Sequence, residues 1–332
     1  MTESKRWLRS RVGIWLVILL GLMGGYGVLG LVICQPVFSG PAKPHPWKVD
    51  PSQLESHVRA IADPERPRDW THVENLDRVA IYIRGILETT GAQVEEQEFE
   101  VRGRTYRNVI AHFGSGSGPR TVVGAHYDAC MPLPGADDNA SGVAGLLELA
   151  KLLSRMPPKE PVDLVAYTLE EPPHFRGPNM GSAHHSRRLR DQGVELRAMV
   201  SLEMIGFFSD EPDSQHFPLG LGIGFYPSSG NFISVVGRMA DAGLTRKIKR
   251  AMSAATPLPV YSMNAPRFVP GIDFSDHFCY WDQGFPAVMV TDTAFYRNQA
   301  YHTRKDTAER LDYKRMAHVV EGLHAALLEL GN

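Results

Sequence analysis

The segment VVGAHYDAC, residues 122–130, ends an apolar run with two polar residues, His126 and Asp128. A histidine at the end of a strand can bind a metal while a nearby carboxylate orients its ring. The same two residues can also cap a strand and do no chemistry. The segment alone leaves both interpretations open, so the other strand ends must decide between them.

Carboxylates and a second imidazole recur after the other apolar runs. Each has an ordinary explanation by itself, because Asp caps helices and acidic side chains are mostly solvated. Ligands, however, gather at the carboxyl ends of the strands in an α/β sheet. Five such positions together predict a cation site. They are HYD itself, Asp137 and Asp138 in PGADDNASG, Glu170 and Glu171 after VDLVAYTL, Glu203 after RAMVSL, and His302 in YHT.

The side-chain types at these positions indicate which cation binds. Imidazole and carboxylate without thiolate suit zinc, with manganese or cobalt as alternatives, whereas calcium and magnesium fit less well. Two histidines and three acidic ligands exceed what one metal needs if it keeps a position for water. The set therefore predicts two metals that share one carboxylate, an arrangement that can deprotonate a shared water and polarise a carbonyl.

Short apolar strands interleaved with helices must position these residues. This pattern predicts an α/β fold, a three-layer α/β/α sandwich with a central, mostly parallel (mixed) sheet. The predicted helices span 52–61, 76–89, 140–153, 181–191 and 307–330, and the predicted strands span 92–102, 107–113, 120–127, 162–169, 196–204 and 287–291.

One N-terminal transmembrane helix is predicted before the sandwich. Basic residues within 1–12 precede the uncharged run 13–34, which is long enough to cross a bilayer. A cleaved signal would have a shorter apolar core and a small-residue cleavage site. The positive-inside rule leaves the N-terminus in the cytoplasm and the rest outside it. The predicted order is a cytoplasmic tail at 1–12, an anchor at 13–34, a Pro-rich tether at 35–50 and a globular domain at 51–332.

The composition narrows the range of partners. A formal net charge of −2 gives no electrostatic reason to bind nucleic acid, so we expect no such partner. The membrane is a predicted partner through the N-terminal helix, and the oligomeric state is not indicated. Of the cysteines, Cys130 and Cys279 lie in the globular domain, and whether they pair is left open.

Six segments occur in the order and approximate spacing of metallopeptidase family 28, which the sequence resembles from about residue 51 to 330. They are HYDA, PGADDNASG, LEE, SLEMIG, SDH and YHT. This family includes co-catalytic di-zinc aminopeptidases, glutamate carboxypeptidase and, as a divergent branch, glutaminyl cyclase. The resemblance implies that 51–332 is a zinc peptidase domain that binds two Zn²⁺ per chain and acts on a peptide substrate.

The resemblance also implies the metal ligands. His126 and Glu203 would complete the shell of one zinc, and Glu171 and His302 that of the other. Asp138 would bridge the two ions. The sequence departs from the family at Glu203, where Asp is common. The longer carboxylate must approach its metal differently.

Three further residues have roles by the same resemblance. Glu170 would be the general base that takes a proton from the bridging water and delivers one to the leaving amine. Asp128 would orient the His126 ring, and Tyr301 would donate to the oxyanion of the tetrahedral intermediate. We expect Cys130 to do no chemistry, since a thiolate would compete for zinc with the other ligands.

A long loop, PPHFRGPNMGSAHHS, replaces the short turn that usually follows the EE pair, which leaves the specificity open. We interpret its histidines, His174, His184 and His185, as ordinary loop or helix residues. Asp276 and His277 in SDH are expected to have only a supporting role.

Removal of an N-terminal residue is the expected reaction, because aminopeptidases are the commonest members of the family. A carboxypeptidase is a second candidate, since it needs arginines to hold a substrate carboxylate. The arginines available for that purpose are Arg176, Arg187, Arg188 and Arg267. A single-zinc glutaminyl cyclase and a non-catalytic membrane scaffold are the third and fourth candidates.

Overall fold

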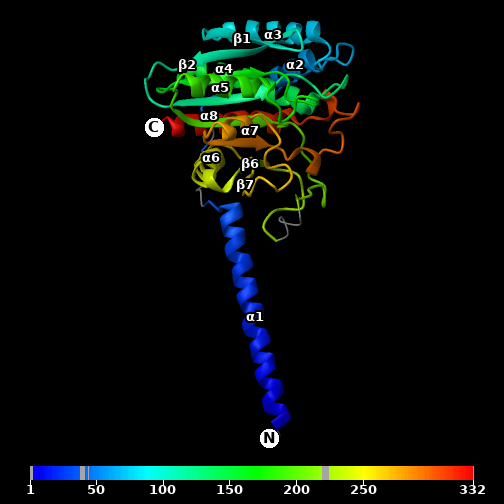
Figure 1. Ribbon diagram of the computed structural model, residues 1–332, viewed down its shortest axis with the longest axis vertical. Helices are drawn as coiled ribbons and strands as arrows, with labels where there is room; N and C mark the ends of the chain where they lie inside the picture. The colour runs from blue at the N-terminus through cyan, green and yellow to red at the C-terminus, as the bar shows by residue number, and fades with distance from the viewer. Residues whose placement is uncertain (1–2, 38–41, 44, 219–223, 332) are drawn as a thin grey trace.

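The computed structural model describes residues 3–37, 42–43, 45–218 and 224–331. Its described part contains an eight-stranded mixed sheet in the order β1-β2-β4-β3-β5-β8-β6-β7 (Figure 1). The predicted α/β sandwich with a central mixed sheet is therefore confirmed. The strands are β1 (Gln93–Val101), β2 (Arg104–Phe113), β3 (Arg120–His126), β4 (Val162–Tyr167), β5 (Leu196–Glu203), β6 (Ile233–Gly237), β7 (Val260–Asn264) and β8 (Ala287–Thr291).

The centre of the sheet is parallel. Strands β4, β3, β5 and β8 lie side by side and run in the same direction, whereas β1 and β2 pair antiparallel at one edge. Each residue of β4 is buried, as expected of a strand covered on both faces. The edge strand β1 has four glutamates among its nine residues, and such charge discourages pairing with another chain.

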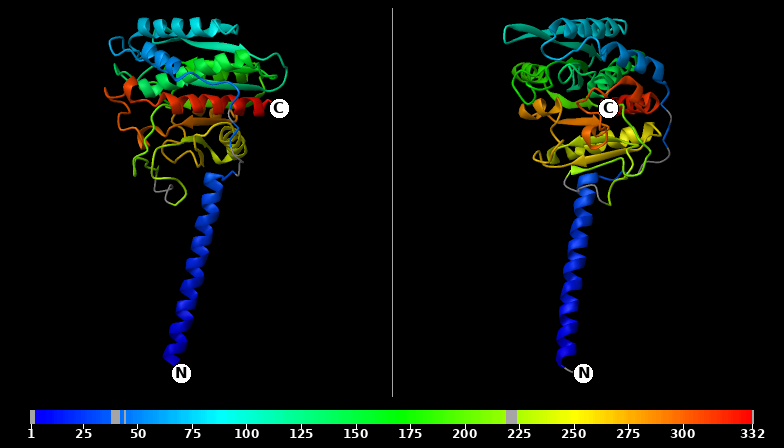
Figure 2. Two further views of the ribbon diagram at one scale, coloured as in Figure 1. Left: turned by 180° about the vertical axis from the view of Figure 1, so that it is seen from behind. Right: turned by 90° about the vertical axis from the view of Figure 1, so that its right-hand side faces the viewer.

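Helices cover both faces of the sheet. One face packs against α2 (Pro51–Ile61), α3 (Val73–Glu88), α4 (Gly142–Arg155), α6 (Ala242–Ala255) and α8 (Tyr313–Leu330). The opposite face packs against α5 (Gly181–Asp191) and α7 (His277–Asp282). The two sets lie on opposite sides of the sheet in Figure 2. Val122 and Val123, successive residues of β3, belong to the two different cores, because strand side chains alternate between faces.

The sequence patterns missed four elements between residues 205 and 286: β6, α6, β7 and α7. Both strands are only five residues long, and α7 has six, too few for periodicity to stand out. The predicted C-terminal helix also begins later than residue 307. Residues Ala308–Arg310 form a 3-10 turn, and Asp312 then caps α8 by accepting a hydrogen bond from the Arg315 N–H.

The N-terminal helix α1 (Glu3–Cys34) projects away from the domain beside β7 (Figure 1). Its segment Ile14–Cys34 is long and apolar enough to cross a membrane, and a helix so near the N-terminus also fits a signal sequence. The Cys34 carbonyl accepts hydrogen bonds from Lys249 at 2.8 Å and Ser262 at 2.7 Å. Part of the predicted tether, residues 38–41 and 44, lies outside the described residues.

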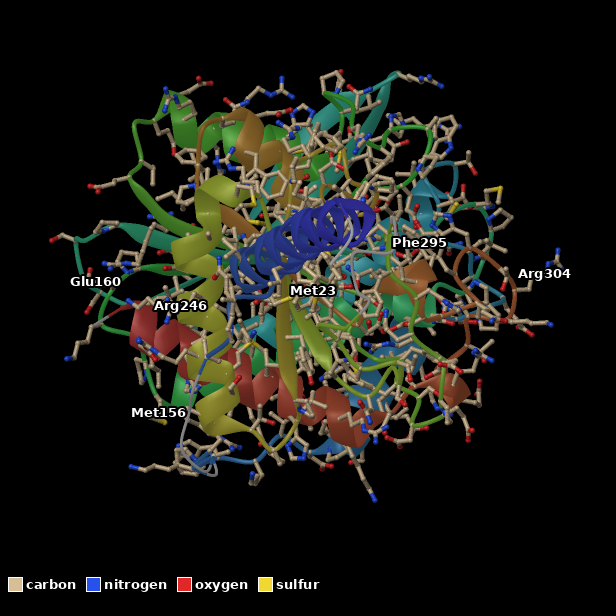
Figure 3. The ribbon with its side chains drawn as sticks, turned by 90° about the horizontal axis from the view of Figure 1, so that it is seen from below. Met23, Met156, Glu160, Arg246, Phe295 and Arg304 are labelled. Atoms are coloured by element: carbon tan, nitrogen blue, oxygen red, sulfur yellow. The ribbon has the colours of Figure 1, made fainter. Side chains whose placement is uncertain are left out.

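Figure 3 views the protein from the end at which α1 leaves the domain. Met23 lies on α1, in front of the domain in this view. Phe295 and Arg304 lie to one side, in the loops that follow β8. These loops carry the last of the predicted site residues.

Candidate metal centre

Parallel strands bring the predicted site residues to one edge of the sheet. His126 is the last residue of β3, and Glu203 is the last residue of β5. Glu170 and Glu171 follow β4, which pairs parallel with β3. Side chains that are distant in the sequence therefore meet at the carboxyl ends of these strands, as expected for this class of fold.

The described residues include two groups of His, Cys, Asp and Glu that could hold a metal, and the first is His126, Asp138 and Glu203. The Nε2 atom of His126 lies 3.4 Å from Asp138 Oδ1 and 3.4 Å from Glu203 Oε2. All three side chains are buried. His126 Nε2 makes no regular hydrogen bond, so this buried nitrogen lacks the partner that such a group requires.

His302 and Glu171 stand on the other side of Asp138. His302 Nε2 lies 3.0 Å from Asp138 Oδ2 and 3.2 Å from Glu171 Oε2. Glu171 Oε1 is buried and makes no hydrogen bond. The two oxygens of Asp138 thus face two separate donor sets. The donors fit a pair of divalent cations that share this carboxylate.

The charge balance supports the same interpretation. Burial, followed by the Asp138 charge, raises the pKa of Glu171 to about 8. Burial also raises the pKa of Glu170 well above its usual value. Burial alone would lower the pKa of His126, but the carboxylates of Glu203 and Glu170 raise it well above its usual value. Buried carboxylates outnumber the imidazoles here, and bound cations would neutralise the excess.

Asp128 connects the loop after β4 to the first donor group. Its two carboxylate oxygens accept the backbone N–H groups of Glu170 and Glu171, each at 3.1 Å. Asp128 Oδ1 also lies 3.5 Å from His126 Nδ1. One buried carboxylate therefore positions both the predicted base and the predicted ligand beside it.

A positive backbone φ occurs next to two of the site residues and at a third. Leu169, which precedes Glu170, has a φ of 61°, and Met204, which follows Glu203, has a φ of 51°. His302 itself has a φ of 54°. Non-glycine residues rarely adopt this conformation, and when they do it often re-aims a side chain at a functional site.

Ser275 is a positioning residue that the sequence analysis missed. Its hydroxyl donates to Glu203 Oε2 at 2.7 Å and also contacts the Ser201 hydroxyl at 2.6 Å. Its only sequence signal was its place in the SDH motif. Of the other two residues of the motif, Asp276 is buried and directly precedes α7, while His277 contacts the Ile272 carbonyl and the Trp281 ring. The supporting role expected of this motif thus includes its serine.

The loop that carries Asp138 is held by two groups that the sequence analysis did not single out. The buried guanidinium of Arg68 donates to the carbonyls of Tyr127, Pro134 and Gly135. The Asp306 carboxylate accepts the backbone N–H of Asp138 at 3.1 Å. Arg68 lies far upstream in the sequence, where no pattern marks it.

The histidines of the long loop after Glu171 lie among other side chains. His174 packs edge-on against Trp70, and His184 stacks on Phe99. His185 Nδ1 lies 2.5 Å from the Tyr280 hydroxyl. None of the three belongs to a metal-binding group among the described residues, in line with their interpretation as ordinary loop and helix residues.

Cys130, which we expect to do no chemistry, lies beside two of the predicted ligands. Cys130, Glu171 and His302 form the second group, with donor atoms within 4.8 Å of one another. Cys279 lies elsewhere, with its sulfur 3.7 Å from Met180 Sδ. Cys34, Cys130 and Cys279 are all free, so Cys130 and Cys279 do not pair.

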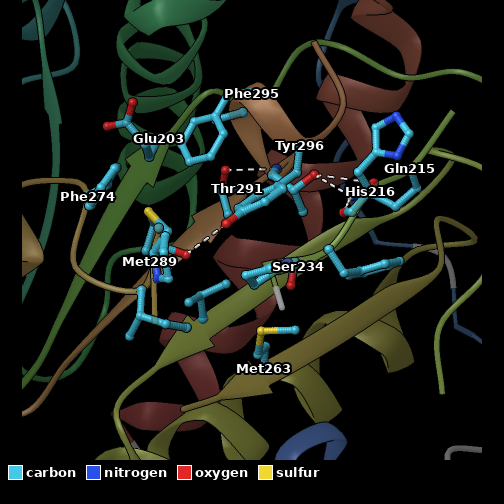
Figure 4. A pocket seen from close by; sticks show the side chains of 18 of the residues that line it. Glu203, Gln215, His216, Ser234, Met263, Phe274, Met289, Thr291, Phe295 and Tyr296 are labelled. Carbon is cyan, nitrogen blue, oxygen red and sulfur yellow. Dashed lines mark hydrogen bonds between the residues drawn. The ribbon is translucent and has the colours of Figure 1, made fainter. Parts of the chain in front are cut away.

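A mostly apolar cavity opens beside Glu203. It encloses about 700 Å³, including its open mouth. Figure 4 shows Glu203 close to Phe274 and Phe295, with Met289, Ser234 and Met263 along another wall. Tyr301 also lines the cavity, and its ring stacks on His302 with 3.8 Å between the centroids.

No arginine is among the described residues that line this cavity. Each of the four arginines considered for a carboxypeptidase has another partner. Arg176 pairs with Asp273, Arg188 with Glu95 and Arg267 with Asp282, whereas Arg187 donates to the Pro178 carbonyl. The cavity therefore offers no guanidinium to a substrate carboxylate.

Comparisons with known proteins agree with this geometry. The model of Peptidase family M28 matches residues 108–327. Uncharacterized protein YfbL of Escherichia coli is 48% identical over 286 residues, which cover 84% of this chain and 88% of that protein. The probable aminopeptidase YDR415C of Saccharomyces cerevisiae is 26% identical over 64% of this chain, and the match spans only 53% of the yeast protein.

Solved structures share the fold. The zinc aminopeptidase BSAP of Bacillus subtilis matches with a TM-score of 0.66 and 14% identity, over 86% of this chain and 96% of that one. A glutaminyl cyclase of Bacteroides thetaiotaomicron matches with a TM-score of 0.63 and 18% identity, over 85% and 98% of the two chains. Because both structures share little sequence identity with this chain, these comparisons show a common fold and no more.

We predict that Ser275→Ala weakens zinc binding about 10- to 100-fold, the usual effect of removing a hydrogen bond to a ligand. The physical reason is that Glu203 loses the donor that fixes its Oε2. Competition with a chromophoric chelator measures the affinity. The control is Ser56→Ala, whose hydroxyl bonds only the Ser52 carbonyl on an exposed helix. Equal affinity in both variants would show that Ser275 does not support the site.

Proposed function

The chain belongs to peptidase family M28, a family of hydrolases, and we propose that it is a zinc-dependent aminopeptidase that binds two zinc ions. The observation that carries this proposal is the pair of donor sets around Asp138, with Glu203 of the first set in the lining of an apolar cavity that contains no arginine among its described residues. In this proposal His126 and Glu203 hold one ion, and Glu171 and His302 hold the other. Bound zinc would lower the pKa of a shared water and polarise the scissile carbonyl.

Glu170 is the proposed general base. Its carboxylate is buried, and its Oε2 lies 3.9 Å from His126 Nε2, beside the donor groups but not a member of either. The backbone N–H of Glu170 donates a hydrogen bond to the Asp128 carboxylate. A carboxylate fixed in this position can accept a proton from the attacking water on Oε2 and then deliver it to the leaving amine.

Tyr301 is the proposed donor to the developing oxyanion. It lines the cavity, and stacking on His302 fixes its ring. Burial raises the pKa of its hydroxyl well above the usual value, so this group stays protonated and able to donate a hydrogen bond.

The cavity favours an aminopeptidase over a carboxypeptidase, a cyclase or a scaffold. The lining is mostly apolar, which suits the side chain of an N-terminal residue. The buried carboxylate of Glu203 at its edge suits the positive charge of a free amino group. The lack of arginine in the lining argues against a carboxypeptidase, and the two complete donor sets argue against a single-zinc cyclase and a scaffold that has lost its ligands.

We further propose that the catalytic domain is anchored outside the cytoplasm by α1. Leucines along the helix, such as Leu20 and Leu22, expose about two thirds of their surface, 65% and 67%. Among the side chains of α1 that the structure describes, those the domain buries lie near the end of the helix, such as Ile33. A bilayer would cover the rest. The proposed order is therefore a tail at 1–12, an anchor at 13–34, a tether at 35–50 and the peptidase domain at 51–332.

The substrate test compares peptides that differ at the N-terminus. A leucyl substrate buries about three more carbons in the cavity than an alanyl substrate. At about 0.8 kcal/mol per carbon this amounts to about 2.4 kcal/mol, so kcat/KM should favour leucine roughly 50-fold. N-acetyl-leucyl peptides should not be cleaved, because they lack the charged amine. Cleavage of the acetylated peptide at the rate of the free one would contradict the aminopeptidase proposal.

Replacing the proposed base gives a second test. Glu170→Gln keeps the shape of the side chain but cannot accept a proton, so kcat should fall by about 10²- to 10⁴-fold. Zinc content should stay at the wild-type level, because Glu170 belongs to neither donor group. Stopped assays on a leucyl peptide measure kcat, and metal analysis of the same sample measures the zinc content. Full activity in the variant would remove Glu170 from the mechanism.

A further inference from the structure

Cys130 lies at the second donor set without an assigned role. Its sulfur, one Glu171 oxygen and one His302 nitrogen all lie within 4.8 Å of one another. The side chain is only 8% exposed and interacts with the His302 imidazole. The first donor set has no equivalent sulfur among the described residues. The two sets therefore differ in chemical character.

The loop that presents Cys130 is fixed on both sides. The Arg68 guanidinium donates hydrogen bonds to the Tyr127 carbonyl, before the cysteine, and to the Gly135 carbonyl, after it. Between them, Met131 turns the chain with a φ of 55°. A buried cation that bonds both ends of a short loop keeps the sulfur where it is, so its place beside His302 is built into the fold.

A second observation points to a ligand in the same place. Glu171 is 4% exposed, and its Oε1 makes no hydrogen bond. A buried carboxylate oxygen without a donor is costly unless a cation satisfies it. Cys130 and Asp138 line a small cavity together with His302. Sulfur, oxygen and nitrogen donors thus converge beside an unsatisfied oxygen.

We propose that the Cys130 thiolate is a ligand of the second zinc ion, together with Glu171, His302 and the shared Asp138. This inference rests on the proposed two-zinc function. When zinc binds, the thiol releases its proton to solvent and the sulfur bonds the metal. With Zn–S near 2.3 Å and Zn–N near 2.0 Å, neighbouring donors around one ion lie about 3 to 3.5 Å apart. The observed spacing needs only a small closure.

The sulfur makes the two sites unequal. With four protein donors and the shared water the second ion would have five ligands, whereas the first ion, with three protein donors and the same water, would have four. Thiolate also favours zinc, cadmium and cobalt over manganese and magnesium. The second site should therefore hold its metal more selectively than the first.

Cobalt gives a direct readout of a sulfur ligand. The full chain is purified in detergent, stripped with a chelator and titrated with Co²⁺. Two equivalents should bind, and one of them should produce a near-ultraviolet sulfur-to-cobalt charge-transfer band. The band should vanish in Cys130→Ser and persist in Cys279→Ser, the matched control, because Cys279 is also a buried free cysteine.

The outcomes of this titration separate the cysteine ligand from the function on which it rests. Two bound equivalents without the band, or a band that survives in Cys130→Ser, overturn the cysteine ligand and leave the two-metal proposal standing. Fewer than two bound equivalents overturn the two-metal proposal and the cysteine ligand with it.

Thiol alkylation of the wild-type protein provides a measurement that needs no variant. Iodoacetamide should label Cys130 in the metal-free protein and fail to label it after zinc is added, as read by peptide mass spectrometry. Labelling of Cys130 that is equal with and without zinc would contradict the proposal. Labelling of Cys279 should not depend on the metal.

Discussion

Negative charge buried at the carboxyl edge of the sheet is the constraint on which the rest of the structure depends. Carboxylates in a desolvated site are strongly destabilising unless cations, protons or hydrogen-bond donors balance them. Two imidazoles alone do not balance this set, as the raised pKa values of His126 and Glu170 indicate. A pair of bound cations would balance it. The buried acidic side chains at this edge include Asp128, Asp138, Glu170, Glu171 and Glu203.

The fold maintains this concentration of charge through the layer behind the donors. Asp128 fixes the loop after β4, Ser275 fixes Glu203, and Arg68 fixes the loop before η1 (Ala136–Ser141). Each contact joins segments that are far apart in the sequence. Because these contacts already fix the donor side chains, the side chains need to move little when a metal binds. The apolar cavity beside Glu203 can then orient a substrate next to the bound metal.

The sequence predicted the parts of the site that local patterns encode. His126 and Glu203 could be found because each ends an apolar run, and the central strands stood out for the same reason. Arg68 and Ser275 could not be assigned roles, since their contacts depend on which loops meet in three dimensions. The position of Cys130 beside His302 could not be inferred from the sequence, because it depends on where the loop after β3 lies. Strands β6 and β7 were too short to show a period.

The zinc content of the purified full chain tests the central claim most directly, because the whole account depends on two cations that share one buried carboxylate. Metal analysis should find close to two zinc ions per chain in the wild-type protein. Asp138→Ala removes the shared carboxylate and should lose both ions. A wild-type content of one ion or none, or an Asp138→Ala variant that still holds two, would contradict the account.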